Sequence, residues 1–219
     1  MVTTLDVISK GRAILGIGAA WYEEEHDGFG FPFPRAGERL DRLEEAVQIC
    51  RALFRDDRPS FRGRFYSIVG ARNVPRPIRA GGPPIMIGGS GERRTLRLVA
   101  QYADQCNISG GPATVAHRLD VLRRHCNDVG RDPSEVLTTR LGTLVLTRGA
   151  EETERTTGFL RGMSGDQFGE QFTVGEADEV VDQVGALVDA GLDGLIFNMP
   201  LSDSETVTHA GELLTKHFA

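Results

Sequence analysis

Short apolar runs alternate with amphipathic helical patterns over most of the chain. The runs that resemble buried strands are 12–18, 83–87, 105–109, 137–147 and 193–198. Apolar residues at helical spacing occupy 38–54, 92–102, 114–129, 177–190 and 204–218. This alternation is typical of parallel βαβ units, whose strands are buried on both faces in a doubly wound sheet or a barrel. We therefore expect an α/β protein with five parallel strands.

Four segments depart from this rhythm. The first residues, 2–9, resemble the end of a helix, and 23–34 is a loop rich in aromatic residues and prolines. Residues 61–68 predict a small hairpin outside the main sheet. The polar segment 151–170 is expected to be helical in its first half and loop-like afterwards. No internal repeat and no interdomain linker interrupts the pattern, so we expect a single domain.

A glycine-rich turn, Gly88-Gly89-Ser90-Gly91, joins an apolar strand to a helical pattern. Glycines let the backbone approach a ligand closely, Ser90 is of a type that caps helices, and the free N–H groups of a first helical turn attract anions. The same residues also suit an ordinary strand-to-helix connection, where glycine serves backbone geometry alone. From the local pattern, an anion site and a plain turn are equally supported.

The carboxyl ends of the predicted strands carry further candidates, because ligands of barrels and doubly wound sheets gather at that edge. Gly18 and Asn107 lie there together with Gly88 and Gly89. Glycine weakens a strand interior, so its use near Gly18 suggests close packing on the backbone, by a ligand or by neighbouring strands.

The loop that follows Gly18 contains aromatic residues, for which we expect either contact with a ligand or packing of the loop itself. We assign Trp21 to a ligand and interpret Phe29, Phe31 and Phe33 as packing residues. His26 follows three glutamates, but no second histidine lies at helical spacing, so a solvated acidic face is favoured and no metal site is expected.

Charge and cysteine content narrow the class of protein. The formal net charge of -6 argues against a nucleic-acid partner or an anionic membrane surface. The three cysteines, Cys50, Cys106 and Cys126, lack metal-binding or disulfide-framework spacing. No signal pattern and no apolar run of membrane-spanning length is present. These features predict a cytoplasmic protein without a membrane partner.

Several blocks of sequence, in this order and spacing, resemble the bacterial luciferase-like superfamily and, within it, the coenzyme F420-dependent oxidoreductases. The resemblance covers nearly the whole chain, and the blocks are Thr4–Arg12, Leu15–Glu25, Phe29–Phe33, Glu38–Glu45, Pro84–Gly91 and Ala103–Asn107. It implies a TIM (β/α)8-barrel type of fold that binds F420 or FMN at the carboxyl ends of the strands.

The resemblance also implies roles for individual residues. Gly88, Gly89, Ser90 and Gly91 would cradle the cofactor phosphate, and Gly16, Gly18 and Trp21 would border the ring or the substrate. The implied reaction is hydride transfer between F420 and a small organic substrate. The alternatives are an FMN-dependent luciferase-like monooxygenase and a non-catalytic remnant or subunit. No catalytic residue is nominated, because His26 and Glu25, although in the right loop, fit a surface role better.

Two departures from the family pattern matter. Cys106 stands where the family commonly has a tryptophan, which implies a different pocket floor. Only about five of eight barrel strands are predicted, so residues 1–219 correspond to the carboxyl-terminal portion of one barrel domain, with an inserted region at about 19–82. Roughly 90 residues of three βα units are missing by comparison with a usual barrel of about 250.

An open sheet exposes edges and apolar surface. We therefore expect a truncated chain, a partner that supplies the rest, or self-association as a homodimer or other oligomer.

Overall fold

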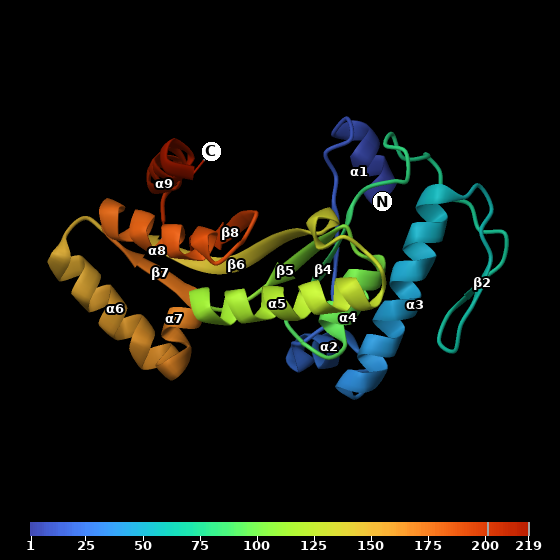
Figure 1. Ribbon diagram of the computed structural model, residues 1–219, viewed down its shortest axis with the longest axis horizontal. Coiled ribbons are helices and arrows are strands. Elements are labelled where there is room, and N and C mark those ends of the chain that lie inside the picture. The colour runs from blue at the N-terminus through green and yellow to red at the C-terminus, as the bar shows by residue number, and fades with distance from the viewer. Residues whose placement is uncertain (201, 219) are drawn as a thin grey trace. The chain divides into compact units, whose positions relative to one another are not determined.

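The computed structural model describes residues 1–200 and 202–218 and contains the predicted alternation of strands and helices (Figure 1). The elements of residues 1–128 are α1 (Val2–Ile8), β1 (Leu15–Ile17), α2 (Glu23–Phe29), α3 (Ala36–Arg55), β2 (Phe61–Arg62), β3 (Ser67–Ile68), β4 (Ile85–Gly88), α4 (Thr95–Tyr102), β5 (Gln105–Ile108) and α5 (Pro112–Asp128). The remaining elements are a 3-10 turn at Pro133–Glu135, β6 (Leu137–Leu146), α6 (Ala150–Ser164), a 3-10 turn at Gly165–Gln167, α7 (Phe168–Gln171), β7 (Phe172–Gly175), α8 (Ala177–Asp189), β8 (Gly194–Asn198) and α9 (Ser204–Phe218).

The chain divides into two compact units. The first contains residues 1–106 and 122–136, and the second contains 107–121 and the chain from residue 137 onward. The boundary falls inside β5 and inside α5, so both elements contribute residues to each unit. The single-domain assignment of 1–219, with its inserted region at 19–82, stays a prediction.

In the first unit, β1 and β4 pair in parallel, and β5 lies next to β4 in the strand order. The register joins Leu15 to Ile85 and Ile17 to Ile87. Ile85 and Ile87 are buried while Met86 and Gly88 are half-buried, which is the alternation expected of a strand with helices on one face. Leu96 and Val99 of α4 are fully buried and complete this core.

The β2–β3 hairpin of the first unit is a separate antiparallel pair beside α3, as the sequence predicted (Figure 1). The Glu45 carboxylate of α3 accepts hydrogen bonds from three consecutive N–H groups of the hairpin turn, those of Arg64, Phe65 and Tyr66, at 2.7, 3.0 and 2.9 Å. A Cβ on Gly63 would lie 2.2 Å from Glu45 Oε2, so a larger residue there would displace the carboxylate from its present position. This single acidic side chain fixes the hairpin to α3.

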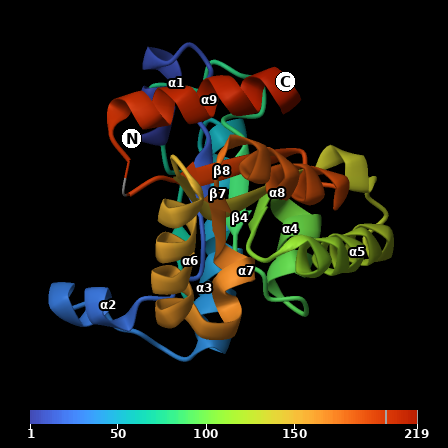
Figure 2. The same cartoon turned by 90° about the vertical axis from the view of Figure 1, so that its left-hand side faces the viewer.

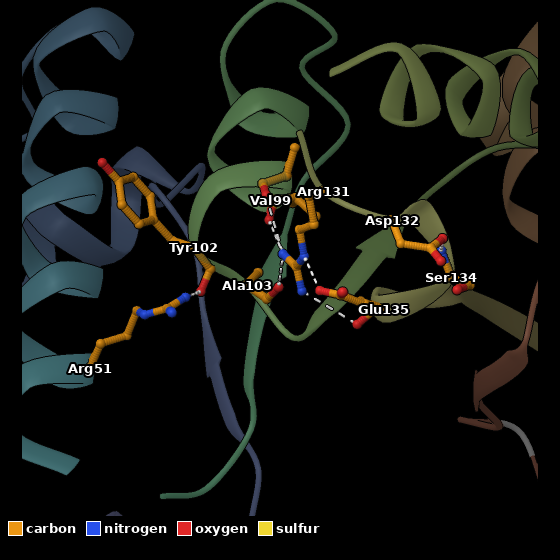
Figure 3. Close-up of polar contacts among 9 residues, drawn as sticks. Arg51, Val99, Tyr102, Ala103, Arg131, Asp132, Ser134 and Glu135 are labelled. Atoms are coloured by element: carbon orange, nitrogen blue, oxygen red, sulfur yellow. Dashed lines mark hydrogen bonds and ion pairs between the residues drawn. The ribbon is translucent and has the colours of Figure 1, made fainter. Parts of the chain in front are cut away.

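Two arginines hold the carboxyl end of α4 (Figure 3). Arg131 Nη1 donates to the carbonyl oxygens of Ala103 at 2.7 Å, Ala100 at 3.2 Å and Val99 at 3.4 Å. Arg51 of α3 donates to the Tyr102 carbonyl. Cations are favourable at a helix carboxyl end, where the last carbonyls lack partners within the helix. These contacts fix the helix that begins just after the glycine-rich turn.

In the second unit, the ten-residue strand β6 pairs in parallel with β7 through Thr143–Leu146 and with β8 through Thr139–Thr143. Leu144 packs with Val180 and Val184 of α8, whereas Val145 packs with Leu160 of α6. Alternation along β6 therefore gives the strand two apolar faces, and α6 and α8 flank β7 (Figure 2).

Three local expectations were wrong. Residues 23–29 form the helix α2 rather than a loop, the helical part of 151–170 extends through Ser164 and resumes at α7, and 172–175 form an additional strand, β7. Helix α2 has no buried residue, so it lacks the apolar stripe on which helix prediction depends. The five predicted strands are all present, as β1, β4, β5, β6 and β8.

No helix within residues 1–200 and 202–218 combines the length and the apolar composition needed to cross a membrane.

Candidate functional site

The carboxyl ends of β1 and β4 bring three glycines into one region of the first unit. Gly16 pairs with Met86 in the parallel register, one step before the strand ends. A Cβ on Gly18 would lie 3.3 Å from the carbonyl oxygen of Gly88, so the two backbones approach closely where both strands end. The sequence predicted Gly16, Gly18 and Gly88 as site residues, and the structure brings them together.

The glycine-rich turn favours glycine at one position through its backbone angle and has little room for a side chain at a second. Gly89 has a φ of 130°, a conformation that residues with a side chain rarely adopt. A Cβ on Gly91 would lie 2.8 Å from Thr95 Oγ1. Gly89 and Gly91 are exposed, while Gly88 and Ser90 are half-buried. The turn therefore offers bare backbone to a ligand, and its residues fit a group, such as a phosphate, that binds peptide N–H donors.

The helix that follows begins later than the sequence predicted. Helix α4 starts at Thr95 with Arg94 as its N-cap, and no side chain caps it. Ser90 is thus not the cap of α4, which corrects that expectation. Residues 92–94 form a turn, and the Leu96 N–H donates to the Gly91 carbonyl at 3.1 Å. Any anion at this turn would consequently be bound by the turn's own backbone rather than by the first turn of α4.

Trp21 lies in the loop after β1 and is 85% exposed. Its ring packs against Tyr22, with the ring centroids 5.4 Å apart. The preceding residue, Ala20, has a φ of 61°, which is uncommon for a residue with a Cβ. The strained turn thus presents an aromatic surface to solvent beside the end of β1.

A cavity of about 380 Å³ lies in the first unit against the end of β1. Most of its lining is apolar and comes from β1, the loop and α3, and four polar side chains also reach it: His26, Arg39, Arg42 and Tyr66. Gly18 lines the cavity as well, so one predicted site residue borders it directly. Sequence reasoning missed Arg39, Arg42 and Tyr66. Apolar spacing locates a helix such as α3 but does not show which of its charged residues reach a cavity, and Tyr66 belongs to the hairpin that was expected outside the main sheet.

His26 takes part in the local structure of this loop. Its Nδ1 lies 3.0 Å from the Tyr22 carbonyl oxygen, and its ring packs edge-on against Phe33 at 4.9 Å between centroids. Phe33 is half-buried, whereas Phe29 and Phe31 are 73% and 65% exposed. The packing role predicted for all three phenylalanines therefore fits Phe33 but not Phe29 and Phe31.

Cys106 and Asn107 point to opposite sides of β5. Cys106 is fully buried, and burial, with a smaller contribution from Cys126 of α5, raises the pKa of its thiol to about 12. Asn107 Nδ2 instead donates to Thr139 Oγ1 of β6 at 2.8 Å in the second unit. The different pocket floor expected from Cys106 stays a prediction.

A family model described as luciferase-like monooxygenase matches residues 1–168. The chain belongs to this family. A curated relative, the F420-dependent glucose-6-phosphate dehydrogenase of Nocardia farcinica (strain IFM 10152), is 27% identical over 232 residues, which cover 91% of this chain and 67% of the relative. The luciferase-like chain thus spans about two thirds of the length of this relative.

Solved structures support the same fold. An F420-dependent secondary alcohol dehydrogenase, in complex with an F420-acetone adduct, superposes with a TM-score of 0.83 at 19% identity and covers 99% of this chain and 72% of that one. A riboflavin lyase with modified FMN and substrate riboflavin superposes with a TM-score of 0.78 at 16% identity, covering 98% and 66%. The predicted fold class, an incomplete TIM barrel of the α/β class, is confirmed.

Proposed function

We propose that this chain is an oxidoreductase that uses coenzyme F420 for hydride transfer to or from a small organic substrate. The observation that carries the proposal is the joined glycine region at the ends of β1 and β4, where bare backbone is open to a ligand. Membership of the luciferase-like family and the F420 dependence of the Nocardia relative support it.

In this proposal the chain's residues bind and orient the cofactor. Gly88, Gly89, Ser90 and Gly91 hold the phosphate through the turn backbone, where no side chain obstructs its approach. Gly16 and Gly18 leave room for the ring, and Trp21 offers an aromatic surface near it. F420, when bound, supplies the hydride chemistry, so the protein contributes placement and electrostatics.

The cavity beside Gly18 suits a substrate with an apolar body. Its walls include Ile17, Leu43 and Ala46, and small molecules commonly bind in apolar pockets with a few polar groups that fix their orientation. A volume of about 380 Å³ lies within the usual range of ligand pockets.

The second candidate is an FMN-dependent monooxygenase. The family is described as luciferase-like monooxygenase, and one structural neighbour holds a modified FMN. A phosphate cradle made of backbone does not discriminate between the two cofactors, because both carry a phosphate.

Titration of the purified chain with each cofactor separates the two candidates. Trp21 is the only tryptophan in the sequence, so quenching of its fluorescence reports binding next to the loop after β1. We expect saturable quenching by F420 that exceeds quenching by FMN at equal concentration. Tight FMN binding without F420 binding would contradict the leading proposal and favour the monooxygenase.

Size-exclusion chromatography with light scattering, combined with the titration, addresses the third possibility of a non-catalytic subunit. A homodimer or other oligomer is our expectation, with a mass at least twice the 23.9 kDa of one chain. A chain that stays monomeric and binds neither cofactor would favour the subunit interpretation instead.

A further inference from the structure

The two ends of the loop that connects β1 to α3 are hydrogen-bonded to the same side chain, that of Arg39. Arg39, in the second turn of α3, donates from Nε to the Ala19 carbonyl at 3.1 Å and from Nη1 to the Pro34 carbonyl at 2.6 Å. Ala19 and Pro34 lie near the two ends of this connection between β1 and α3, which also contains the short helix α2. Because a guanidinium is planar and presents its N–H groups in a fixed fork, the two bonds set the distance between these ends.

Ring contacts continue this closure through the loop. The Arg39 guanidinium lies 3.9 Å from the centroid of the Phe33 ring, and Phe33 packs edge-on against His26. His26 Nδ1 lies 3.0 Å from the Tyr22 carbonyl oxygen. A continuous set of contacts thus runs from α3 through Phe33 and His26 back to Tyr22, and it encloses the turn that contains Ala20 and Trp21.

That turn needs an external constraint. Ala20 has a φ of 61°, a conformation that costs free energy for a residue with a Cβ and persists only where surrounding contacts require it. Trp21 is 85% exposed and does not supply the missing constraint by burial. The hydrogen bond from Arg39 to Ala19, the residue directly before Ala20, does supply one.

We propose that Arg39 is a positioning residue that holds the Gly18–Trp21 turn in the conformation that receives the cofactor ring and the substrate. The expected effect of Arg39 on cofactor binding rests on the proposed function. Its effect on the conformation of the turn does not. Arg39 acts through the loop, since its contacts are with Ala19, Pro34 and Phe33, and it also lines the cavity that Gly18 borders.

Arg42 provides a matched control on the same helix. It lines the same cavity and also lies over a phenylalanine ring, that of Phe65, at 4.6 Å. Its Nε and Nη2 donate to Glu38 of α3 at 2.9 and 2.7 Å, so these bonds stay within its own helix. Loss of Arg42 therefore removes a charge and a stacked arginine from the cavity wall without releasing Ala19 or Pro34.

The test compares Arg39→Met, Arg39→Lys and Arg42→Met with the unmodified chain, using the fluorescence anisotropy of Trp21 in the absence of any ligand. Arg39→Met should lower the anisotropy, because the released turn lets the indole move. Arg39→Lys should behave similarly, since a single ammonium group lacks the fork that joins the two carbonyls. Arg42→Met should keep the original value.

Cofactor titration of the same variants supplies the second measurement. The two charge-assisted hydrogen bonds from Arg39 to the Ala19 and Pro34 carbonyls hold the turn that receives the cofactor. Their loss should weaken F420 binding by about tenfold in both Arg39 variants. Arg42→Met keeps both bonds, so its F420 binding should weaken by less than about threefold. Unchanged anisotropy in Arg39→Met, or full recovery in Arg39→Lys, would overturn the positioning role. Lower anisotropy with undiminished F420 affinity would also overturn it.

The two proposals fail in different ways. If the unmodified chain binds no F420, the proposed function fails, while the ligand-free anisotropy still decides whether Arg39 holds the turn. If the unmodified chain binds F420 and the Arg39 variants match it in both measurements, only the positioning role fails.

Discussion

Gly89 illustrates how a single backbone angle limits the choice of residue. Its φ of 130° excludes a Cβ in practice, and a Cβ there would also lie 3.2 Å from the Thr95 methyl group. The sequence identified this glycine as a site candidate but left open whether it served a ligand or the turn alone. The observed angle shows that the turn requires it, whatever binds there.

Gly89→Ala should lower the free energy of unfolding by about 1–3 kcal/mol because the variant must keep a strained backbone angle. Gly37→Ala is the matched control in the same unit: it lies in α3, and its Cβ would meet no atom closer than 3.8 Å. That control should raise stability by about 0.5–1 kcal/mol. Urea unfolding of both variants checks the pair, and equal losses would contradict the strain argument.

Cys106 leads to a pH prediction. Burial raises the pKa of its thiol from 9.0 to about 12, so the folded state keeps the proton where the unfolded state releases it. The stabilisation is complete below pH 9 and is lost as the pH rises towards 12, at about 1.4 kcal/mol per pH unit. Unfolding free energies between pH 8 and about pH 10.5 should fall more steeply for the unmodified chain than for Cys106→Ala. Parallel slopes would contradict the buried-thiol interpretation.

At the scale of elements, helix α4 depends on arginines that are distant in sequence. Arg131 contacts three carbonyls at the end of α4, and the pattern of apolar residues gave no sign of this contact. The same is true of Arg39, whose partners are the backbone carbonyls of two other residues. A periodicity argument locates helices and strands, but it cannot show which carbonyl a long side chain reaches.

Arg131→Met should lower the free energy of unfolding by about 1–3 kcal/mol, because buried carbonyls of α4 lose a charged donor. Arg62→Met, an exposed substitution on the hairpin, should change it by less than about 0.5 kcal/mol. Thermal unfolding of the two variants measures the difference. If Arg131→Met proves as stable as the unmodified chain, the arginine contacts at α4 contribute nothing.

Helix α2 and strand β7 show where prediction from sequence stops. Three glutamates in the first turn of α2 favour a helix N-terminus, and Gly30 in the left-handed region ends it, so both signals were present. They were outweighed by the aromatic and proline-rich context. Strand β7 has four residues, and its pairing with Thr143–Leu146 of β6 cannot be derived from local composition.

For the whole molecule, the five predicted strands and the class of fold followed from the alternation of apolar and amphipathic segments, because burial on both strand faces enforces that pattern. The family resemblance placed the site at the ends of β1 and β4, and the family match supports the resemblance. The cavity beside Gly18 could not be predicted, since it depends on how the loop folds back on α3.

The central proposal is that the Gly88–Gly91 turn holds the phosphate of F420. The most direct test measures, by calorimetry, the affinity of the unmodified chain and of Gly89→Ala for F420 and for a deazaflavin analogue without the phosphate. The unmodified chain should bind F420 at least about tenfold more tightly than the analogue, a difference of about 1.4 kcal/mol. That preference should disappear in Gly89→Ala. Equal affinity of the unmodified chain for both ligands, or a preference that survives in Gly89→Ala, would contradict a phosphate site at this turn.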